Sequence, residues 1–183
     1  MSLKFGILGI LASTGPRSGY DIKTYFEQGP NHVWQADLPQ IYRTLDQLEQ
    51  AEYVVVEADP SNARNRKVYT ITSAGRAALL EWLQEDFEWS AVRDTNLLRV
   101  FFGALAPPGV LKQQVSSQRK QFIEILEQYR QVEIHVAQAS ERHPDEAFFW
   151  SLTVQSGLRL MQAWIDWSDD VLKQLEDREK GQS

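Results

Sequence analysis

The chain of 183 residues contains no cysteine, only three histidines and no long apolar run. The lack of cysteine excludes disulfide bonds, thiol catalysis and cysteine-ligated zinc, and it fits a reducing cytoplasm. A membrane helix needs roughly 18 successive apolar residues, which no segment provides. The opening stretch MSLKFGILGILASTG resembles a signal peptide, but its glycines and the segments that follow favour a folded helix. We therefore expect a cytoplasmic protein.

Patterns typical of catalysis and metal binding are also missing. His32, His135 and His143 lack the spacing of metal ligands, and there is no glycine-rich phosphate loop. The hydroxyl and acidic side chains are explained as helix caps and solvated faces. The sequence predicts a protein that is not an enzyme and that uses no metal or cofactor.

The charge is negative overall but unevenly distributed. A net charge of −6 argues against a protein that coats nucleic acid without selectivity, because such binding depends on neutralising phosphates. Between Asp59 and Glu81, however, the chain has no acidic residue but carries Arg64, Arg66, Lys67 and Arg76. An acidic protein with one local basic patch is expected.

Turn and capping residues divide the first part of the chain into short helices. A largely apolar helix over residues 3–12 ends at the STGPRSG turn, and a second over 19–28 is capped by Ser18 and ended by the Gly-Pro pair at 29–30. A third helix starts at Asp37, which forms a capping-box-like pair with the residue three positions on. Its buried stripe is predicted to be Ile41, Thr44, Leu45 and Leu48.

Two segments rich in β-branched and aromatic residues follow. EYVVVEA at 52–58 and RKVYTIT at 66–72 are joined by DPSNARN, which predicts a hairpin with a protruding tip. Ser73 is expected to cap a fourth helix over 74–88. Three short helices followed by a two-stranded hairpin form a winged helix-turn-helix. The fold class is therefore mainly α with a small β-hairpin, the winged helix occupying residues 1–88.

The remaining residues, 89–183, are predicted to be helical. Pro107 and Pro108 open a long helix that runs to about residue 139 and measures roughly 45–50 Å at 1.5 Å per residue. Residues spaced alternately by four and three form an a/d seam along it: Leu111, Val115, Gln118, Phe122, Ile125, Tyr129, Val132 and Val136. A helix of that length needs a partner helix.

The chain supplies a partner after His143 and Pro144, in a segment that is apolar around much of its circumference between Phe148 and Trp167. A helix apolar on several sides is buried on several sides, so a second copy of the chain is expected to cover what the first long helix leaves open. We predict a two-fold homodimer held by the first helix and both long helices. Gln118 either fixes the register of this seam or is simply solvated.

The outward side of the third helix carries Gln40, Tyr42, Arg43, Asp46 and Gln47. In one interpretation this helix lies in a DNA major groove, where Arg43 reads guanine, Gln40 or Gln47 reads adenine and Tyr42 meets a phosphate or a thymine methyl. Arg64, Arg66 and Lys67 at the hairpin tip would then straddle the adjacent backbone or minor groove. In the other interpretation the side is merely solvated and the tip is a soluble basic loop. The order and spacing of helix and basic wing favour the first.

Several separated motifs resemble the PadR family of bacterial transcriptional regulators. LKFGILGILASTGPRSGYDI, QIYRTLDQLEQAEYV and RKVYTITSAGRAALLEWL resemble its winged helix, and LLRVFFGALAPP with two long helices resembles the subfamily with a helical dimerisation domain. The resemblance implies a dimeric repressor whose third helix and wing contact operator DNA. It also implies that Ser18 and Tyr20, near the start of the second helix, touch phosphate.

Two residues depart from the family pattern. Glu52 stands where a glycine usually ends the third helix, and a non-glycine residue in the left-handed region costs about 1 kcal/mol, so we expect this end to close differently. Asp46 would meet phosphates unfavourably unless it accepts a hydrogen bond from a cytosine amine or pairs with Arg43.

The resemblance further implies a small aromatic effector, such as a phenolic acid, that releases the repressor from DNA. The sequence offers Trp34, Trp89, Trp150 and Arg159 as a candidate pocket, so residues 89–183 are a candidate effector-binding as well as dimerisation domain. Other residues considered for the same pocket are Trp82, Phe148, Phe149, Trp164 and Trp167, with His135, Arg99 and Arg130 as further partners for a carboxylate. The alternative is that these aromatic residues form ordinary core and dimer interface.

A different class of function also fits the predicted architecture. A winged helix can serve as a protein-interaction adaptor that dimerises through a helical seam and reads no DNA. An adaptor needs no basic wing and should tolerate Arg64→Glu or Arg66→Glu, whereas a repressor should lose DNA affinity.

Overall fold

The computed structural model describes residues 3–28, 34, 36–58, 66–87 and 93–181 of the chain. Two compact units divide it, Met1–Trp89 and Ser90–Ser183. The first contains α1 (Leu3–Thr14), α2 (Gly19–Gln28), α3 (Leu38–Gln50), β1 (Val54–Ala58), β2 (Lys67–Ile71) and α4 (Ser73–Trp82). The second contains α5 (Thr95–Phe101), a 3-10 turn η2 (Gly103–Leu105), α6 (Val110–Ala139) and α7 (Pro144–Gly181).

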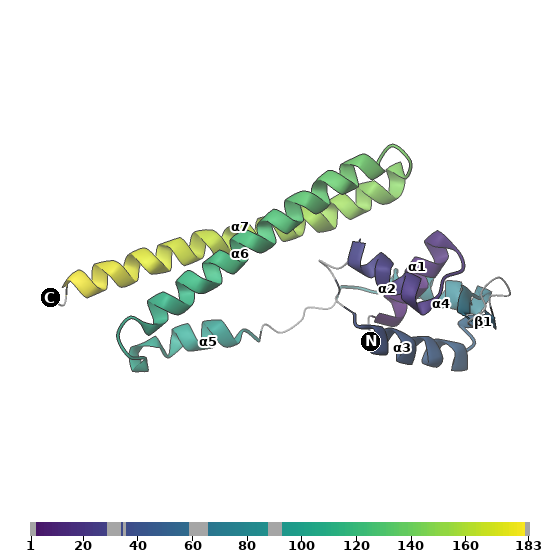
Figure 1. Cartoon of the computed structure of the whole chain (residues 1–183), viewed down its shortest axis with the longest axis horizontal. Helices are drawn as coiled ribbons and strands as arrows, with labels where there is room; N and C mark the ends of the chain where they lie inside the picture. Colours follow the sequence, from purple (N-terminus) through teal and green to yellow (C-terminus); the bar gives the residue numbers. More distant parts are fainter. Residues whose placement is uncertain (1–2, 29–33, 35, 59–65, 88–92, 182–183) are drawn as a thin grey trace. The chain divides into compact units, whose positions relative to one another are not determined.

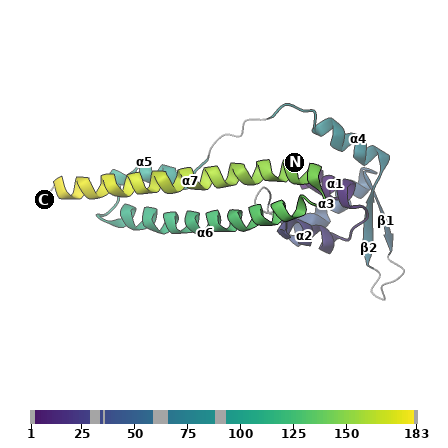
Figure 2. The ribbon, with the colours of Figure 1, turned by 90° about the horizontal axis from the view of Figure 1, so that it is seen from above.

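The first unit is built around one apolar core to which α1, α2, α3 and the hairpin all contribute. Its buried side chains are Ile7, Leu8, Ile10, Leu11, Ile22, Phe26, Ile41, Leu45, Leu48, Val54, Tyr69 and Ile71. β1 and β2 pair antiparallel from Val54 opposite Ile71 to Ala58 opposite Lys67, and they run side by side in Figure 2. The three helices and the hairpin form the predicted winged helix-turn-helix.

Element boundaries in this unit differ from the prediction in several places, and both strands are shorter than predicted, β1 starting at Val54 and β2 covering Lys67–Ile71. α1 continues to Thr14, and the hydroxyls of Ser13 and Thr14 donate to carbonyls one turn back. Thr72, not Ser73, is the N-cap of α4, and its hydroxyl accepts the Gly75 N–H at 3.0 Å. α4 then ends at Trp82, well before the predicted residue 88.

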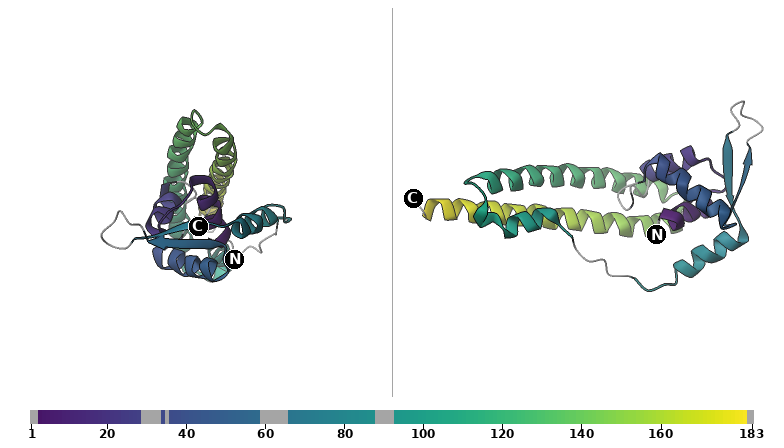
Figure 3. Two further views of the ribbon diagram at one scale, coloured as in Figure 1. Left: turned by 90° about the vertical axis from the view of Figure 1, so that its right-hand side faces the viewer. Right: turned by 90° about the horizontal axis from the view of Figure 1, so that it is seen from below.

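In the second unit α6 and α7 form a long helical hairpin and lie side by side in every view (Figures 1 and 3). α6 does not start at the prolines. Gly109 at φ +78° interrupts the helical backbone, so Pro107 and Pro108 form a turn before the helix begins at Val110.

The predicted seam along α6 is used largely within the chain. Val115 is buried, the Phe122 ring stacks on Trp164 of α7 at 5.7 Å, and the Tyr129 ring lies against Gly157. Within one chain Ile125 is 37% exposed, whereas the next residue, Leu126, is 7% exposed. The place of Ile125 in a seam between two copies stays a prediction.

One chain leaves much of α7 uncovered. Among the described residues, large apolar side chains of this helix remain exposed at Phe148, Phe149, Leu152 and Leu160. The segment predicted to be buried on several sides is therefore buried on one side by its own chain. No helix of the described residues is both long and apolar enough to cross a membrane.

Candidate nucleic-acid interface

α3, the helix predicted to lie in the DNA major groove, has one buried side and one polar side. Ile41, Leu45 and Leu48 are buried, as the spacing predicted, while Thr44 is only half-buried. The exposed residues are Gln40, Tyr42, Arg43, Asp46 and Gln47. The side of α3 that carries hydrogen-bonding groups is thus open to solvent in this unit.

Local contacts fix the start of α3. The carboxylate of Asp37 accepts the Gln40 N–H at 2.7 Å, and Oε1 of Gln40 accepts the Asp37 N–H at 3.4 Å, which completes the predicted capping box. The second bond is long for a hydrogen bond, so little is lost when Gln40 turns to another partner. Nε of Arg43 donates to the Pro39 carbonyl at 3.3 Å, an interaction within the helix that leaves its guanidinium exposed.

Tyr42 connects α3 to the start of α2. Its ring packs over Gly19, where an added Cβ would lie 2.6 Å from Cε1 of the tyrosine. The glycine therefore permits a close approach that any larger residue would prevent. Tyr42 remains partly exposed, so its ring can serve both as a spacer between the helices and as part of the outer surface.

The end of α3 closes in the manner of a glycine-capped helix, although no glycine is present. Glu52 adopts φ +59°, its N–H donates to the Glu49 carbonyl at 2.9 Å, and the Tyr53 N–H donates to the Leu48 carbonyl at 2.9 Å. These two bonds define a Schellman motif. The expectation that this end closes differently was wrong: Glu52 takes the left-handed conformation and bears its cost.

Thr72 ties this end of α3 to the start of α4. Its hydroxyl lies 2.8 Å from the Glu52 carbonyl oxygen and 3.2 Å from that of Tyr53, while accepting the N–H of Gly75. Gly75 packs so tightly on the same backbone that an added Cβ would lie 2.2 Å from the Tyr53 carbonyl oxygen. The exit from α3 is therefore fixed by contacts from the cap and the first turn of α4.

The middle of β2 is held by the turn between α1 and α2. Arg17 exchanges two backbone hydrogen bonds with Tyr69 of β2, at 3.1 and 2.8 Å. The Tyr69 side chain is buried, and burial, followed by the charges of Asp46 and Glu49, raises the pKa of its hydroxyl above 10.0. The neutral phenol therefore stays in the core and links β2 with the side of α3.

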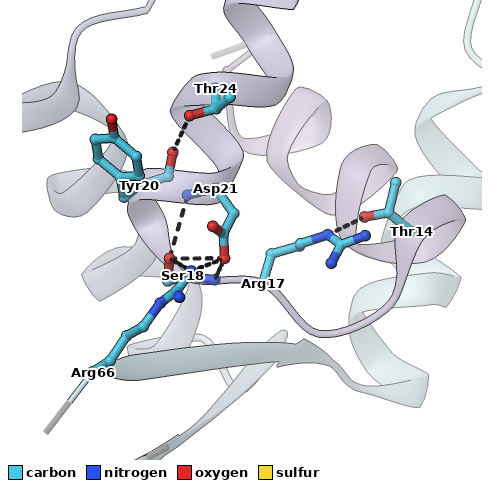
Figure 4. Close-up of polar contacts among 7 residues, drawn as sticks. All are labelled: Thr14, Arg17, Ser18, Tyr20, Asp21, Thr24 and Arg66. Carbon is cyan, nitrogen blue, oxygen red and sulfur yellow. Dashed lines mark hydrogen bonds and ion pairs between the residues drawn. The ribbon is translucent and has the colours of Figure 1, made fainter. Parts of the chain in front are cut away.

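Arg66, directly before β2, reaches the start of α2 (Figure 4). Its Nη2 donates to Oγ of Ser18 at 2.8 Å and to the carboxylate of Asp21. Burial raises the pKa of Asp21, but hydrogen bonds from Ser18 and the bond and charge of Arg66 outweigh it, so the pKa lies below 3.8. Sequence reasoning missed this cluster, although the SGYD stretch at 18–21 has the spacing of a capping box.

The structure separates the two predicted phosphate contacts of α2. Ser18 is 3% exposed and its hydroxyl is occupied by Asp21 and Arg66, so it does not fit the role that the sequence suggested. Tyr20 is 64% exposed and does fit. In the wing, Lys67 is exposed, whereas Arg64 lies outside the described residues.

The candidate effector residues are divided between the two units of the chain. Trp34 is exposed in the first unit, Trp150 is half-buried and Arg159 exposed on α7, and Trp89 lies outside the described residues. Neither α7 residue lines the cavity of 210 Å³ beside α5 and α6 or that of 280 Å³ between α6 and α7. Trp164 packs on Phe122 and Trp167, which agrees with the alternative that these aromatics are core.

A polar α3 surface, a hairpin braced against α2 and a cap that fixes the end of α3 define a winged helix-turn-helix protein. Comparisons with known proteins agree: residues 7–81 match the model of the transcriptional regulator PadR-like family, and residues 92–176 match that of the virulence activator alpha C-terminal domain. The chain belongs to the PadR-like family of transcriptional regulators.

Curated relatives and solved structures span nearly the whole chain. The probable transcriptional regulator Rv1176c of Mycobacterium tuberculosis is 27% identical over 97% of this chain and 100% of its own length. The negative transcriptional regulator PadR of Bacillus subtilis is 24% identical over 95% and 97%.

Among solved structures, Bacillus subtilis PadR in complex with operator DNA has a TM-score of 0.83 at 22% identity, covering 96% of this chain and 99% of that one. The Vibrio cholerae virulence activator AphA has a TM-score of 0.81 at 26% identity, covering 97% and 99%. PadR in complex with p-coumaric acid has a TM-score of 0.77 at 23% identity, covering 96% and 99%.

Proposed function

We propose that the protein is a dimeric repressor that binds double-stranded operator DNA through α3 and the wing. The observation that carries this proposal is the exposed set Gln40, Tyr42, Arg43 and Gln47 on a helix whose opposite side is buried. Amide and guanidinium groups match the donor and acceptor patterns of base edges in a major groove. In this arrangement Arg43 reads guanine, Gln40 or Gln47 reads adenine, and Tyr42 meets phosphate or a thymine methyl.

The wing and the start of α2 supply contacts to the DNA backbone. Lys67 and Tyr20 are exposed, and Arg66 stands at the loop end of the hairpin, next to Lys67. Arg64, on the other side of Arg66 in the sequence, completes the basic set. Backbone contacts of this kind set the register of a protein on DNA without reading its sequence.

A homodimer is the form proposed to bind. One copy makes few phosphate contacts, and the acidic remainder of the chain repels DNA. Two copies double the number of phosphate contacts and place the half-sites one helical turn apart, roughly 34–36 Å. The exposed apolar residues of α7, Phe148, Phe149, Leu152 and Leu160, support a two-fold contact through the helical unit. Sedimentation analysis should give twice the chain mass of 21.1 kDa.

Release by a small aromatic effector completes the proposal. Support comes from the likeness to PadR, a relative whose structure has been solved with p-coumaric acid. The candidate residues on this chain are Trp34, Trp89, Trp150 and Arg159. Titration with hydroxycinnamic acids, followed by tryptophan fluorescence and by loss of DNA binding, tests this part separately from DNA recognition.

The decisive experiment is selection of duplexes from a random pool, together with titration of the region upstream of the gene at roughly 150 mM salt, where non-specific binding is weak. An enriched sequence bound by one dimer supports the repressor. Arg43→Ala should then cost about 1–3 kcal/mol and relax preference at one base pair. Absence of enrichment, with Arg64→Glu and Arg66→Glu tolerated, would favour a protein-interaction adaptor instead.

A further inference from the structure

The geometry around Arg66 gives one carboxylate a role that sequence motifs do not assign. Both hydrogen bonds of the guanidinium to α2 use a single nitrogen, Nη2, which meets Ser18 and Asp21. Toward the described residues, Nη1 and Nε make no hydrogen bond, and the side chain is 38% exposed. An arginine has five N–H donors in a rigid plane. Nη2 of Arg66 is held by Ser18 and Asp21, whereas the N–H groups of Nε and Nη1 have no partner among the described residues.

Asp21 is itself rigidly placed before it meets the arginine. Oδ2 accepts the Ser18 N–H at 3.0 Å and the Ser18 hydroxyl at 2.9 Å, and the Asp21 N–H returns to Oγ of Ser18 at 3.3 Å. This is a reciprocal capping box at the first turn of α2. The next residue, Ile22, is fully buried, which anchors that turn in the core. The acceptor for Arg66 is therefore fixed by the helix.

The Ser18 hydroxyl is fully hydrogen-bonded within the cluster. It donates to Asp21 and accepts from Arg66 and from the Asp21 N–H, which uses one donor and two lone pairs (Figure 4). These bonds fix the position of Nη2. They hold the start of β2 against α2, with Arg66 and Asp21 45 residues apart in sequence.

We propose that Asp21 is a positioning residue for DNA binding: it holds Arg66 at the loop end of the hairpin so that the N–H groups of Nε and Nη1 donate to a backbone phosphate. This inference rests on the proposed repressor function. An unrestrained arginine must lose rotamer freedom when it binds a phosphate, and a carboxylate that orients it beforehand removes most of that loss. Asp21 contacts Arg66 and does not itself contact the DNA.

If Asp21 instead opposed DNA binding, the effect of removing its charge would have the opposite sign. A carboxylate close to DNA repels phosphates, and one that sequesters Arg66 competes with them for the same cation. If Asp21 were such a competitor, or a bystander, removing its charge would strengthen binding. If it positions Arg66, removing its charge weakens binding even though the protein becomes more positive. The sign of the change separates the two roles.

Asp21→Asn is the informative variant, because its amide oxygen can still accept the Ser18 N–H while the charge is lost. Glu57→Gln is the matched control: Glu57 is an exposed carboxylate on β1 of the same wing, and the change in charge is identical. Asp21→Glu restores the charge within an equally good capping box. Each variant is titrated in the full-length protein against the duplex that the unmodified protein enriches from a random pool, at several salt concentrations.

Asp21→Asn should weaken binding roughly tenfold, the loss expected for one charge-assisted hydrogen bond. The salt slope of the association constant should also fall by about 1 per subunit, because one phosphate contact is lost. Glu57→Gln should bind as tightly as the unmodified protein or more tightly. Asp21→Glu should recover most of the affinity. In an Arg66→Ala background, Asp21→Asn should cause no further loss.

If Asp21 only stabilised the fold, the DNA titrations of Asp21→Asn would give a different result. Partial unfolding lowers the active fraction, measured by stoichiometric titration, but leaves the salt slope of the folded fraction unchanged. The inference is overturned if Asp21→Asn binds as tightly as Glu57→Gln, or if its loss persists in the Arg66→Ala background. If the unmodified protein enriches no sequence and binds no duplex, the repressor function falls, and this inference falls with it.

Discussion

The ring of Tyr129 on α6 lies so close to the backbone of Gly157 on α7 that a Cβ at position 157 would be 2.1 Å from the ring. Real Cβ atoms do not approach a neighbour so closely, so the two helices meet at this point only because residue 157 has no side chain. The register of the helical hairpin is therefore tied to one glycine.

Gly157→Ala should destabilise the protein by about 1–3 kcal/mol, because the tyrosine must leave its rotamer or the helices must separate. Urea unfolding monitored by circular dichroism measures the change. Ser156→Ala, an exposed neighbour on the same helix, should stay within about 0.5 kcal/mol of the unmodified protein. Equal stability of the two variants would show that Tyr129 moves aside without cost.

Glu52→Gly should stabilise the protein by about 0.5–1 kcal/mol, because glycine adopts the positive φ of this position without the steric cost that glutamate bears. The contrasting variant is Gln50→Gly, two residues earlier in the regular helix, which should destabilise by a similar amount. Thermal and urea unfolding measure the stability change in both variants. A loss of stability in Glu52→Gly would contradict the strain inferred at this position.

Thr72→Val should cost about 1–2 kcal/mol, since valine keeps the shape but removes both the cap of α4 and the bond to the end of α3. Thr72→Ser keeps the hydroxyl and should lose only a few tenths of a kcal/mol. The measurement is the urea concentration at the unfolding midpoint of each variant, analysed with one shared dependence of unfolding free energy on urea concentration. A full loss in the serine variant would mean that the methyl group, not the hydroxyl, carries the effect.

The ion pair between Arg119 and Asp169 should contribute little despite its good geometry. Its two bonds, at 2.6 and 3.0 Å, are bidentate, but both side chains are partly exposed and screened by solvent. A double-mutant cycle with alanine should give a coupling energy below about 1 kcal/mol, and the coupling should shrink as salt is raised. A larger, salt-insensitive value would indicate that the pair is shielded from solvent in the assembled protein.

Acid should weaken the cluster of Asp21, Ser18 and Arg66. The pKa of Asp21 lies below 3.8 in the folded chain, so its stabilising effect is complete above 3.8 and is lost as the pH falls through the lower folded value. The difference in unfolding free energy between the unmodified protein and Asp21→Asn should therefore be larger at about pH 6 than at about pH 2.5. A difference that does not change with pH would contradict ionisation of Asp21 as its source.

Neighbouring residues along the chain determined most of the winged helix. The capping pair of Asp37 and Gln40 and the buried spacing of Ile41, Leu45 and Leu48 define α3 locally, so they could be predicted before any contact between elements was known. The same is true of the hairpin, whose strands are β-rich and lie next to each other in sequence.

Tertiary structure decided which of the predicted polar side chains remain free to contact DNA. The sequence suggested both Arg66 and Ser18 as contacts for DNA. In the folded chain both lie beside Asp21: Ser18 is buried there, and Arg66 is held by hydrogen bonds. Glu52 looked incompatible with a normal helix end, yet Thr72 and the surrounding core hold it there. Such contacts join residues far apart in sequence, and no local periodicity encodes them. The sequence by itself determined the elements and their buried sides, whereas the packed core decided which polar groups are occupied, because hydrogen-bond partners are chosen only when the elements meet.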